Sequence, residues 1–68
     1  MNEENFNMSI RKYLKTVGVT AQREIEKAVR QALAEGKLKD VERLTIEARI
    51  KIPGVALDLD VNGELEIR

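Results

Sequence analysis

Acidic side chains near the C-terminus form the first pattern that could do binding chemistry. The stretch LDLDVNGELEIR, which begins at Leu57, places four carboxylates around an Asn-Gly pair, and a further glutamate lies on the segment before it. Carboxylates in this pattern could bind a divalent cation or a basic protein, or they could form the solvated face of a hairpin. The residues of this candidate partner surface are Glu47, Asp58, Asp60, Glu64 and Glu66.

A solvated hairpin face is the interpretation that we favour for these acids. Calcium takes about six to eight oxygens that converge from a curved loop, whereas side chains diverge from a twisted sheet, and the sequence has no EF-hand spacing. Arg49, Lys51 and Arg68 can neutralise part of the negative charge. A basic protein partner is the functional alternative, and a cation site ranks below it.

Basic residues in LKTVGVTAQREIEKAVRQAL form the second candidate site. The stretch is typical of two helices joined by a turn that contains glycine, and this invites a helix-turn-helix interpretation. Glu24 and Glu26 lie among the basic residues and the usual third helix is missing, so an ordinary αα-hairpin is favoured. Nucleic-acid binding is kept as the alternative function. Its recognition residues would be Gln22, Arg23, Lys27 and Arg30.

The residue types exclude several classes of chemistry. The chain has no Cys and no His, so it can form neither disulfides nor thiolate or imidazole zinc sites. Ser9 and Tyr13 have no histidine or cysteine to act with, and no glycine-rich phosphate loop is present. We therefore expect no enzyme activity, no cofactor and no metal.

Charge and hydropathy describe a small folded protein with no long-range attraction for polyanions. The 68 residues include 12 basic and 12 acidic side chains, and a balanced charge argues against binding to nucleic acid or to an anionic membrane. No apolar segment is long enough to predict a signal peptide or a membrane span, so we expect a cytoplasmic protein. A single domain of this length has a thin core, which self-association could enlarge.

Helical spacing predicts two helices in the first half of the chain, at about residues 3–17 and 21–35. Gly18 is expected to end the first helix, Thr20 to cap the second, and Gly36 to adopt the left-handed C′ conformation. The apolar residues at helical spacing are Phe6, Ile10, Tyr13, Leu14 and Val17, followed by Ala21, Ile25, Ala28, Val29, Ala32 and Leu33.

Alternation of apolar and polar residues predicts three strands in the second half, at about 43–52, 55–61 and 64–68. Pro53-Gly54 and Asn62-Gly63 would form the turns between them. The expected fold class is therefore α+β with the order ααβββ, in which two helices pack on one face of a three-stranded antiparallel meander.

The requirement that apolar residues face each other across strands constrains both turns. A turn at Pro53-Gly54 places Ile50 opposite Leu57. A two-residue Asn-Gly turn would mix apolar and acidic faces, so a three-residue loop of residues 61–63 is expected instead, which pairs Leu59 with Leu65. A loop of residues 62–64 would satisfy the same requirement and break up part of the acidic cluster, and parity does not choose between the two.

The opening MNEENFNMSIRKYLKTVGVTAQREIEKAVRQALAEGKL resembles that of a family of small bacterial proteins of unknown function, and the tail resembles it more loosely. The resemblance implies a bacterial cytosolic origin and transfers no catalytic or binding residue. We expect a non-enzymatic module that associates with itself, as a possible homodimer, or with an unidentified protein partner, through a sheet edge or through its oppositely charged faces.

Overall fold

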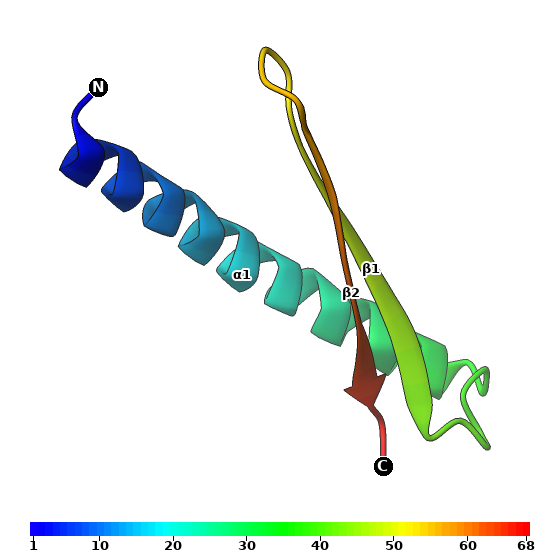
Figure 1. Ribbon diagram of the computed structural model, residues 1–68. Coiled ribbons are helices and arrows are strands. Elements are labelled where there is room, and N and C mark those ends of the chain that lie inside the picture. The colour runs from blue at the N-terminus through cyan, green and yellow to red at the C-terminus, as the bar shows by residue number, and fades with distance from the viewer. The chain divides into compact units, whose positions relative to one another are not determined.

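The computed structural model describes residues 1–68 and divides the chain into two compact units, Met1–Leu38 and Lys39–Arg68 (Figure 1). The first unit contains one α-helix and the second contains one antiparallel sheet of two strands. The α+β class therefore holds, but the expected ααβββ order is wrong. The chain has one long helix in place of two and two long strands in place of three.

Helix α1 (Glu3–Ala34) begins at a side-chain cap. The Asn2 side chain accepts a hydrogen bond from the backbone N–H of Asn5 at 3.1 Å, which satisfies one of the free donors in the first turn. Glu3 and Glu4 place negative charge at the positive end of the helix dipole. The predicted start of the helix is confirmed.

A Schellman motif ends α1. Gly36 has a φ of 74°, and its N–H donates to the carbonyl oxygen of Leu33 at 3.1 Å, while the N–H of Lys37 donates to that of Ala32 at 3.0 Å. These two bonds satisfy carbonyl groups that the end of a helix leaves free. The left-handed C′ position predicted for Gly36 is confirmed.

The predicted helix break at Gly18 is wrong, because α1 continues through this residue. Gly18 does not have the positive φ of a helix-ending glycine, and Thr20, the expected cap, lies inside α1. The apolar face keeps its phase across the glycine, since Val17 and Ala21 are four residues apart and lie on the face that begins with Phe6. A glycine costs a helix interior only about 0.5–1 kcal/mol relative to alanine.

The second unit is a hairpin of β1 (Arg43–Ile52) and β2 (Leu57–Glu66). Strand β1 has the bounds of the first predicted strand. The loop of residues 53–56 joins the two strands, and within it Gly54 has a φ of 95°, which favours glycine. The N–H of Val55 donates to the carbonyl oxygen of Ile52 at 3.3 Å and closes the loop.

Strand β2 continues through Asn62-Gly63, so the predicted second turn and the third strand at 64–68 are wrong. Gly63 pairs with Ile46 inside the sheet and does not have a positive φ. Residues on both sides of Gly63 keep the same alternation of apolar and polar side chains, and an unbroken strand satisfies this alternation without any loop.

The register of the hairpin differs by two residues from the prediction, because Ile50 pairs with Leu59 and not with Leu57. The loop is centred one residue later than expected, between Gly54 and Val55. A shift of two residues leaves every side chain on its original face. The faces of β1 and of residues 57–61 are therefore as predicted, although their pairing is not.

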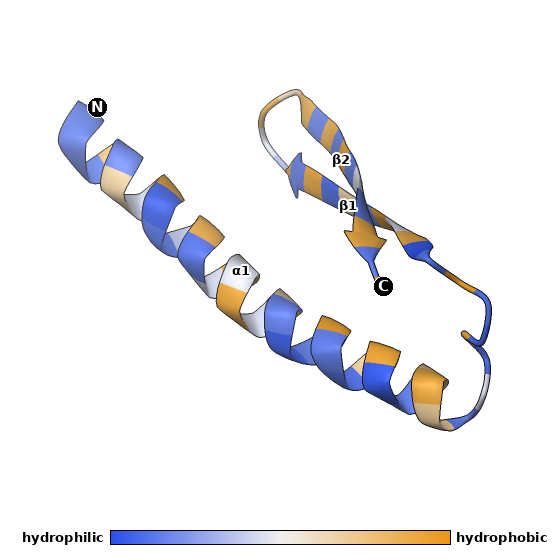
Figure 2. Cartoon of the chain, turned by 90° about the horizontal axis from the view of Figure 1, so that it is seen from below, coloured by the Kyte–Doolittle hydropathy of each residue, from blue (hydrophilic) through white to orange (hydrophobic).

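Neither unit contains a fully buried residue. The apolar residues lie along one side of α1 and alternate with polar ones along both strands (Figure 2). Large side chains such as Phe6, Leu14 and Leu59 leave 46%, 48% and 45% of their surface accessible. Each unit, taken by itself, therefore leaves its apolar face accessible.

Candidate functional site

The five predicted acidic residues lie on one face of the hairpin, which we call the charged hairpin face. In the observed register, all four acids of β2 lie opposite a basic or neutral residue of β1. The predicted pairing would have placed acids of neighbouring strands side by side, and the observed register does not. The opposed pairs on this face are Arg43–Glu66, Thr45–Glu64, Glu47–Asn62, Arg49–Asp60 and Lys51–Asp58.

Arg49 organises the centre of the charged hairpin face. Its Nε donates to Asp58 Oδ1 at 2.7 Å and its terminal NH2 nitrogen (Nη2) donates to Asp58 Oδ2 at 2.6 Å, a bidentate pair along the diagonal of the sheet. Asp60 Oδ1 lies 3.9 Å from the same Nε. The hydrogen bonds from Arg49 lower the pKa of the Asp58 carboxyl, and those to Asp58 raise the pKa of Arg49.

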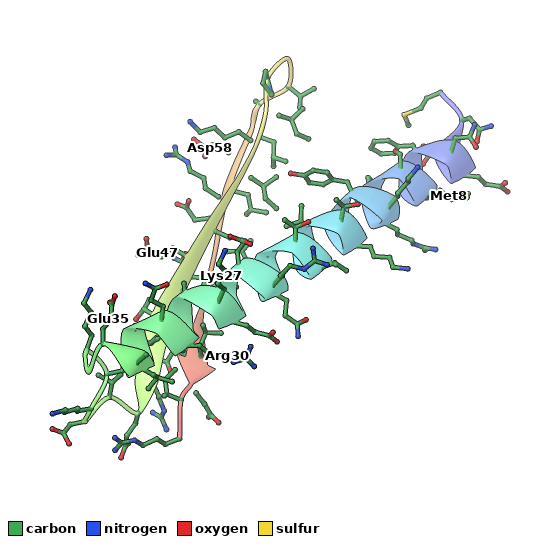
Figure 3. The ribbon with its side chains drawn as sticks, turned by 180° about the vertical axis from the view of Figure 1, so that it is seen from behind. Met8, Lys27, Arg30, Glu35, Glu47 and Asp58 are labelled. Atoms are coloured by element: carbon green, nitrogen blue, oxygen red, sulfur yellow. The ribbon has the colours of Figure 1, made fainter.

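The charged hairpin face is open and only partly neutralised, because it carries three basic and five acidic side chains. Figure 3 shows Glu47 and Asp58 as side chains that extend from the hairpin. A shallow hollow on this face is lined by Glu47, Ala48, Arg49, Asp60 and Asn62. No three His, Cys, Asp or Glu side chains come together in a group that could hold a metal ion. The Arg49 guanidinium already contacts Asp58 and Asp60 on this face.

The opposite side of the hairpin carries apolar residues along its whole length, and we call it the apolar hairpin face. Every pair on this side joins two apolar residues or an apolar residue and glycine. Val61 and Leu59 are 52% and 45% exposed. The members are Leu44, Ile46, Ala48, Ile50 and Ile52 on β1, and Leu57, Leu59, Val61, Gly63 and Leu65 on β2.

The sequence predicted part of the apolar hairpin face and missed its continuity. The expected turn at Asn62-Gly63 separated Leu65 from the strand that contains Leu57 and Leu59. A signal was present in the sequence, because the odd-numbered residues from Leu57 to Ile67 are apolar or glycine without interruption. In the structure Gly63 belongs to this face, where a Cβ atom built on it would lie 3.7 Å from Cγ2 of Ile46.

The candidate nucleic-acid residues Gln22, Arg23, Lys27 and Arg30 all lie on α1, where Figure 3 shows Lys27 and Arg30. The helix-turn-helix geometry is wrong, because α1 has no turn before them. Glu26 engages two of these side chains: Gln22 Nε2 donates to its Oε1 at 3.2 Å, and a terminal nitrogen of Arg30 lies 3.7 Å from its Oε2.

No helix of the chain combines the length and the hydropathy needed to cross a membrane. In a comparison with known families, a model described as a family of unknown function (DUF6494) matches residues 1–68. No curated protein and no solved structure matches the chain.

Proposed function

We propose that this chain, which belongs to DUF6494, a family of unknown function, is a non-enzymatic module that binds a protein surface through the apolar hairpin face. The protein surface is either a second copy of the chain or a separate partner. Membership of an uncharacterised family confirms the resemblance seen in the opening residues.

The continuous apolar hairpin face is the observation that supports this proposal. An isolated two-stranded hairpin is marginally stable in water, and a sheet gains stability when its apolar face packs on another element. Ile50 is half-buried while its partner Leu59 is 45% exposed, so a large part of the face is accessible. Contiguous apolar surface of this kind is typical of protein–protein contacts.

The charged hairpin face supports the same proposal, because the ion pair at its centre is satisfied within the chain and offers little binding energy to a partner. The bidentate contact between Arg49 and Asp58 satisfies both partners within the chain. Exposed ion pairs of this type contribute little binding energy, since water and salt screen them. We therefore expect the free energy of association to come mainly from the apolar hairpin face.

Nucleic-acid binding through α1 remains the rival function and has lost the two-helix geometry on which it depended. Balanced charge gives no long-range attraction for phosphate. The two functions differ in their response to salt. Phosphate contacts predict a steep loss of affinity for DNA or RNA as salt rises, whereas an apolar contact between proteins is nearly independent of salt.

A matched pair of lysine substitutions tests the proposal. Leu59→Lys places a charge on the apolar hairpin face, and Asn62→Lys places the same charge on the charged hairpin face of the same strand, opposite Glu47. The measurements are the molecular mass in solution across protein concentration, at low and high salt, and the fluorescence of a dye that binds apolar surface.

We expect the wild-type chain either to self-associate or to bind the dye as a monomer. In both cases Leu59→Lys reduces the signal and Asn62→Lys leaves it nearly unchanged. A wild-type chain that is monomeric at every concentration and binds no dye would show that the face is not available, and the proposal would fail.

A further inference from the structure

Strand β1 has one backbone edge that is free. The even-numbered residues of β1 form the hydrogen-bonded pairs with β2, because Glu42 accepts from the N–H of Ile67 and such pairs alternate along antiparallel strands. The N–H and C=O groups of the odd-numbered residues point away from β2, and the sheet has no third strand to bind them. Helix α1 cannot take this place, because its backbone groups bond to each other along the helix. The residues of this free edge of β1 are Arg43, Thr45, Glu47, Arg49 and Lys51.

Glu47 is the one charged residue of β1 that has no opposite charge across the hairpin. Arg43, Arg49 and Lys51 each lie opposite an acid of β2, whereas Glu47 lies opposite Asn62. Glu47 also forms no ion pair within the chain. Strand β2 contains no basic residue, so the β2 strand of another copy could not supply a base to Glu47. A second β1 strand carries three.

Two β1 strands that pair antiparallel about a two-fold axis at Ala48 provide this base. Glu47 of each copy then lies directly opposite Arg49 of the other, and Thr45 lies opposite Lys51, so no like charges are opposed. An axis at either neighbouring residue would set Glu47 or Arg49 against itself. An interface with two-fold symmetry must be self-complementary, and the free edge of β1 meets this condition at Ala48.

The same axis also joins the apolar sides of the two hairpins. Even-numbered residues lie opposite even-numbered ones, so Ala48 faces itself on the axis and Ile46 faces Ile50. The odd-numbered residues form the hydrogen-bonded pairs, and these are the residues whose backbone groups are free. The result is a sheet of four strands with one continuous apolar face. A two-stranded hairpin alone is marginally stable in water, whereas three or more strands with an apolar face can be stable.

The acidic strands limit this sheet to four strands. Pairing of the two β1 edges leaves both β2 strands outermost, and like charges disfavour the addition of one acidic edge to another. Pairing of β1 with β2 of the next copy would instead leave a free edge of each kind and would grow without closing. The acidic residues of each outer strand are Asp58, Asp60, Glu64 and Glu66.

We propose that two copies of this chain pair through the free edges of β1, about a two-fold axis at Ala48, to form an antiparallel sheet in the order β2-β1-β1-β2. The inference goes beyond the proposed function, because it rests on the backbone groups and charges of an edge and not on the apolar hairpin face. The two can therefore fail separately.

Charge reversal at the central pair tests the register. Glu47→Arg sets an arginine against Arg49 on both sides of the axis, and Arg49→Glu sets two glutamates against each other in the same way. We expect each variant alone to raise the dissociation constant of the dimer by about tenfold in sedimentation experiments. An equimolar mixture should form heterodimers with a dissociation constant within about threefold of the wild-type value, because each arginine then faces a glutamate.

Asn62→Lys is the matched control, because it adds positive charge to the same face on β2, away from the axis. Its dissociation constant should equal that of the wild type. A mixture that dimerises no better than either variant alone would overturn the register, and assemblies that grow without limit would indicate pairing of β1 with β2. A wild-type chain that is monomeric at every concentration would overturn the dimer, while dye binding by that monomer would leave the proposed function standing.

Disulfide trapping measures the position of the axis directly, since the chain has no cysteine of its own. Cα atoms opposite each other at a non-hydrogen-bonded site are about 4.5 Å apart, within the range of a disulfide, so Ala48→Cys should cross-link with itself. Ile46→Cys should not, because its two copies lie about four residues, or about 13 Å, apart along the strands. The opposite result would refute the register.

Val61→Cys is the control for cross-linking between faces, because Val61 lies opposite Ala48 on the apolar hairpin face of the same chain. In the edge dimer Val61 lies on the outer strand, and Val61→Cys should stay monomeric on a denaturing gel. Two hairpins stacked face to face would link through Val61→Cys as readily as through Ala48→Cys. That result would refute the edge dimer and support the apolar hairpin face as the contact.

Discussion

Substitution of two glycines should change stability in opposite directions if the hairpin is paired as described. Gly63 lies within β2, does not have a positive φ, and has room for a Cβ atom that would touch Ile46 Cγ2 at the ordinary contact distance of 3.7 Å. Gly63→Ala should therefore stabilise the fold by about 0.5–1 kcal/mol, because alanine loses less backbone entropy on folding. The contact of the new Cβ atom with Ile46 adds little to this gain in stability, because it lies on an exposed face.

Gly54 is the control, because its φ of 95° strains any residue with a Cβ atom. Gly54→Ala should destabilise the fold by about 1–2 kcal/mol. The assay is urea unfolding followed by circular dichroism, at one protein concentration for all variants. If Gly63→Ala is instead destabilising by a comparable amount, Gly63 is a left-handed turn residue, and the continuous β2 strand and its register are refuted.

Three further substitutions test the helix and the ion pair. Gly18→Ala should raise the free energy of unfolding by about 0.5–1 kcal/mol, since its Cβ would meet no atom within 4 Å; a loss of stability would indicate that α1 is broken there. Asn2→Ala should cost about 1 kcal/mol, because the N–H of Asn5 loses its acceptor, and unchanged thermal unfolding would exclude this cap. The hydrogen bonds from Arg49 lower the pKa of Asp58 in the folded state, so their contribution to stability is present above the unfolded pKa and is lost as pH falls through the folded pKa. An NMR titration of the Asp58 carboxyl should show this low pKa, and Arg49→Ala should return the pKa toward its ordinary value. The same pKa of Asp58 in the wild-type chain and in Arg49→Ala would argue against the pair.

The sequence predicted which side chains share a face of the hairpin better than it predicted their partners. The alternation of apolar and polar residues determines on which face of the hairpin each side chain lies, because a period of two is a property of extended backbone. The pairing depends on where the loop is centred, and a loop of residues 53–56 leaves the parity of residues such as Ile50 and Leu59 unchanged. Parity therefore could not distinguish the observed register from one shifted by two residues.

The predicted helix break at Gly18 and the predicted turn at Asn62-Gly63 are wrong for the same physical reason. Gly18 and Asn62-Gly63 are local signals for a break, and in both places the apolar pattern on either side stays in phase. A glycine permits a turn but does not enforce one, since its cost within a helix or a strand is only about 1 kcal/mol. Gly36 did end a helix, and there the helical pattern also stops. The phase of the apolar pattern on the two sides of a glycine therefore predicts a break in a helix or strand better than the glycine itself does.

The free edge of β2 carries charges that disfavour pairing between two copies of that edge. The N–H of Ile67 donates to the carbonyl oxygen of Glu42 at 2.8 Å, and hydrogen-bonded pairs alternate along antiparallel strands. The backbone groups that point to the free edge of β2 therefore belong to Asp58, Asp60 and the other even-numbered residues, four of which are acidic. Two β2 edges would bring these acids together in one sheet, and like charges side by side destabilise strand pairing. The acidic residues thus act against edge pairing of two β2 strands, which favours contact through the apolar hairpin face over contact through that edge.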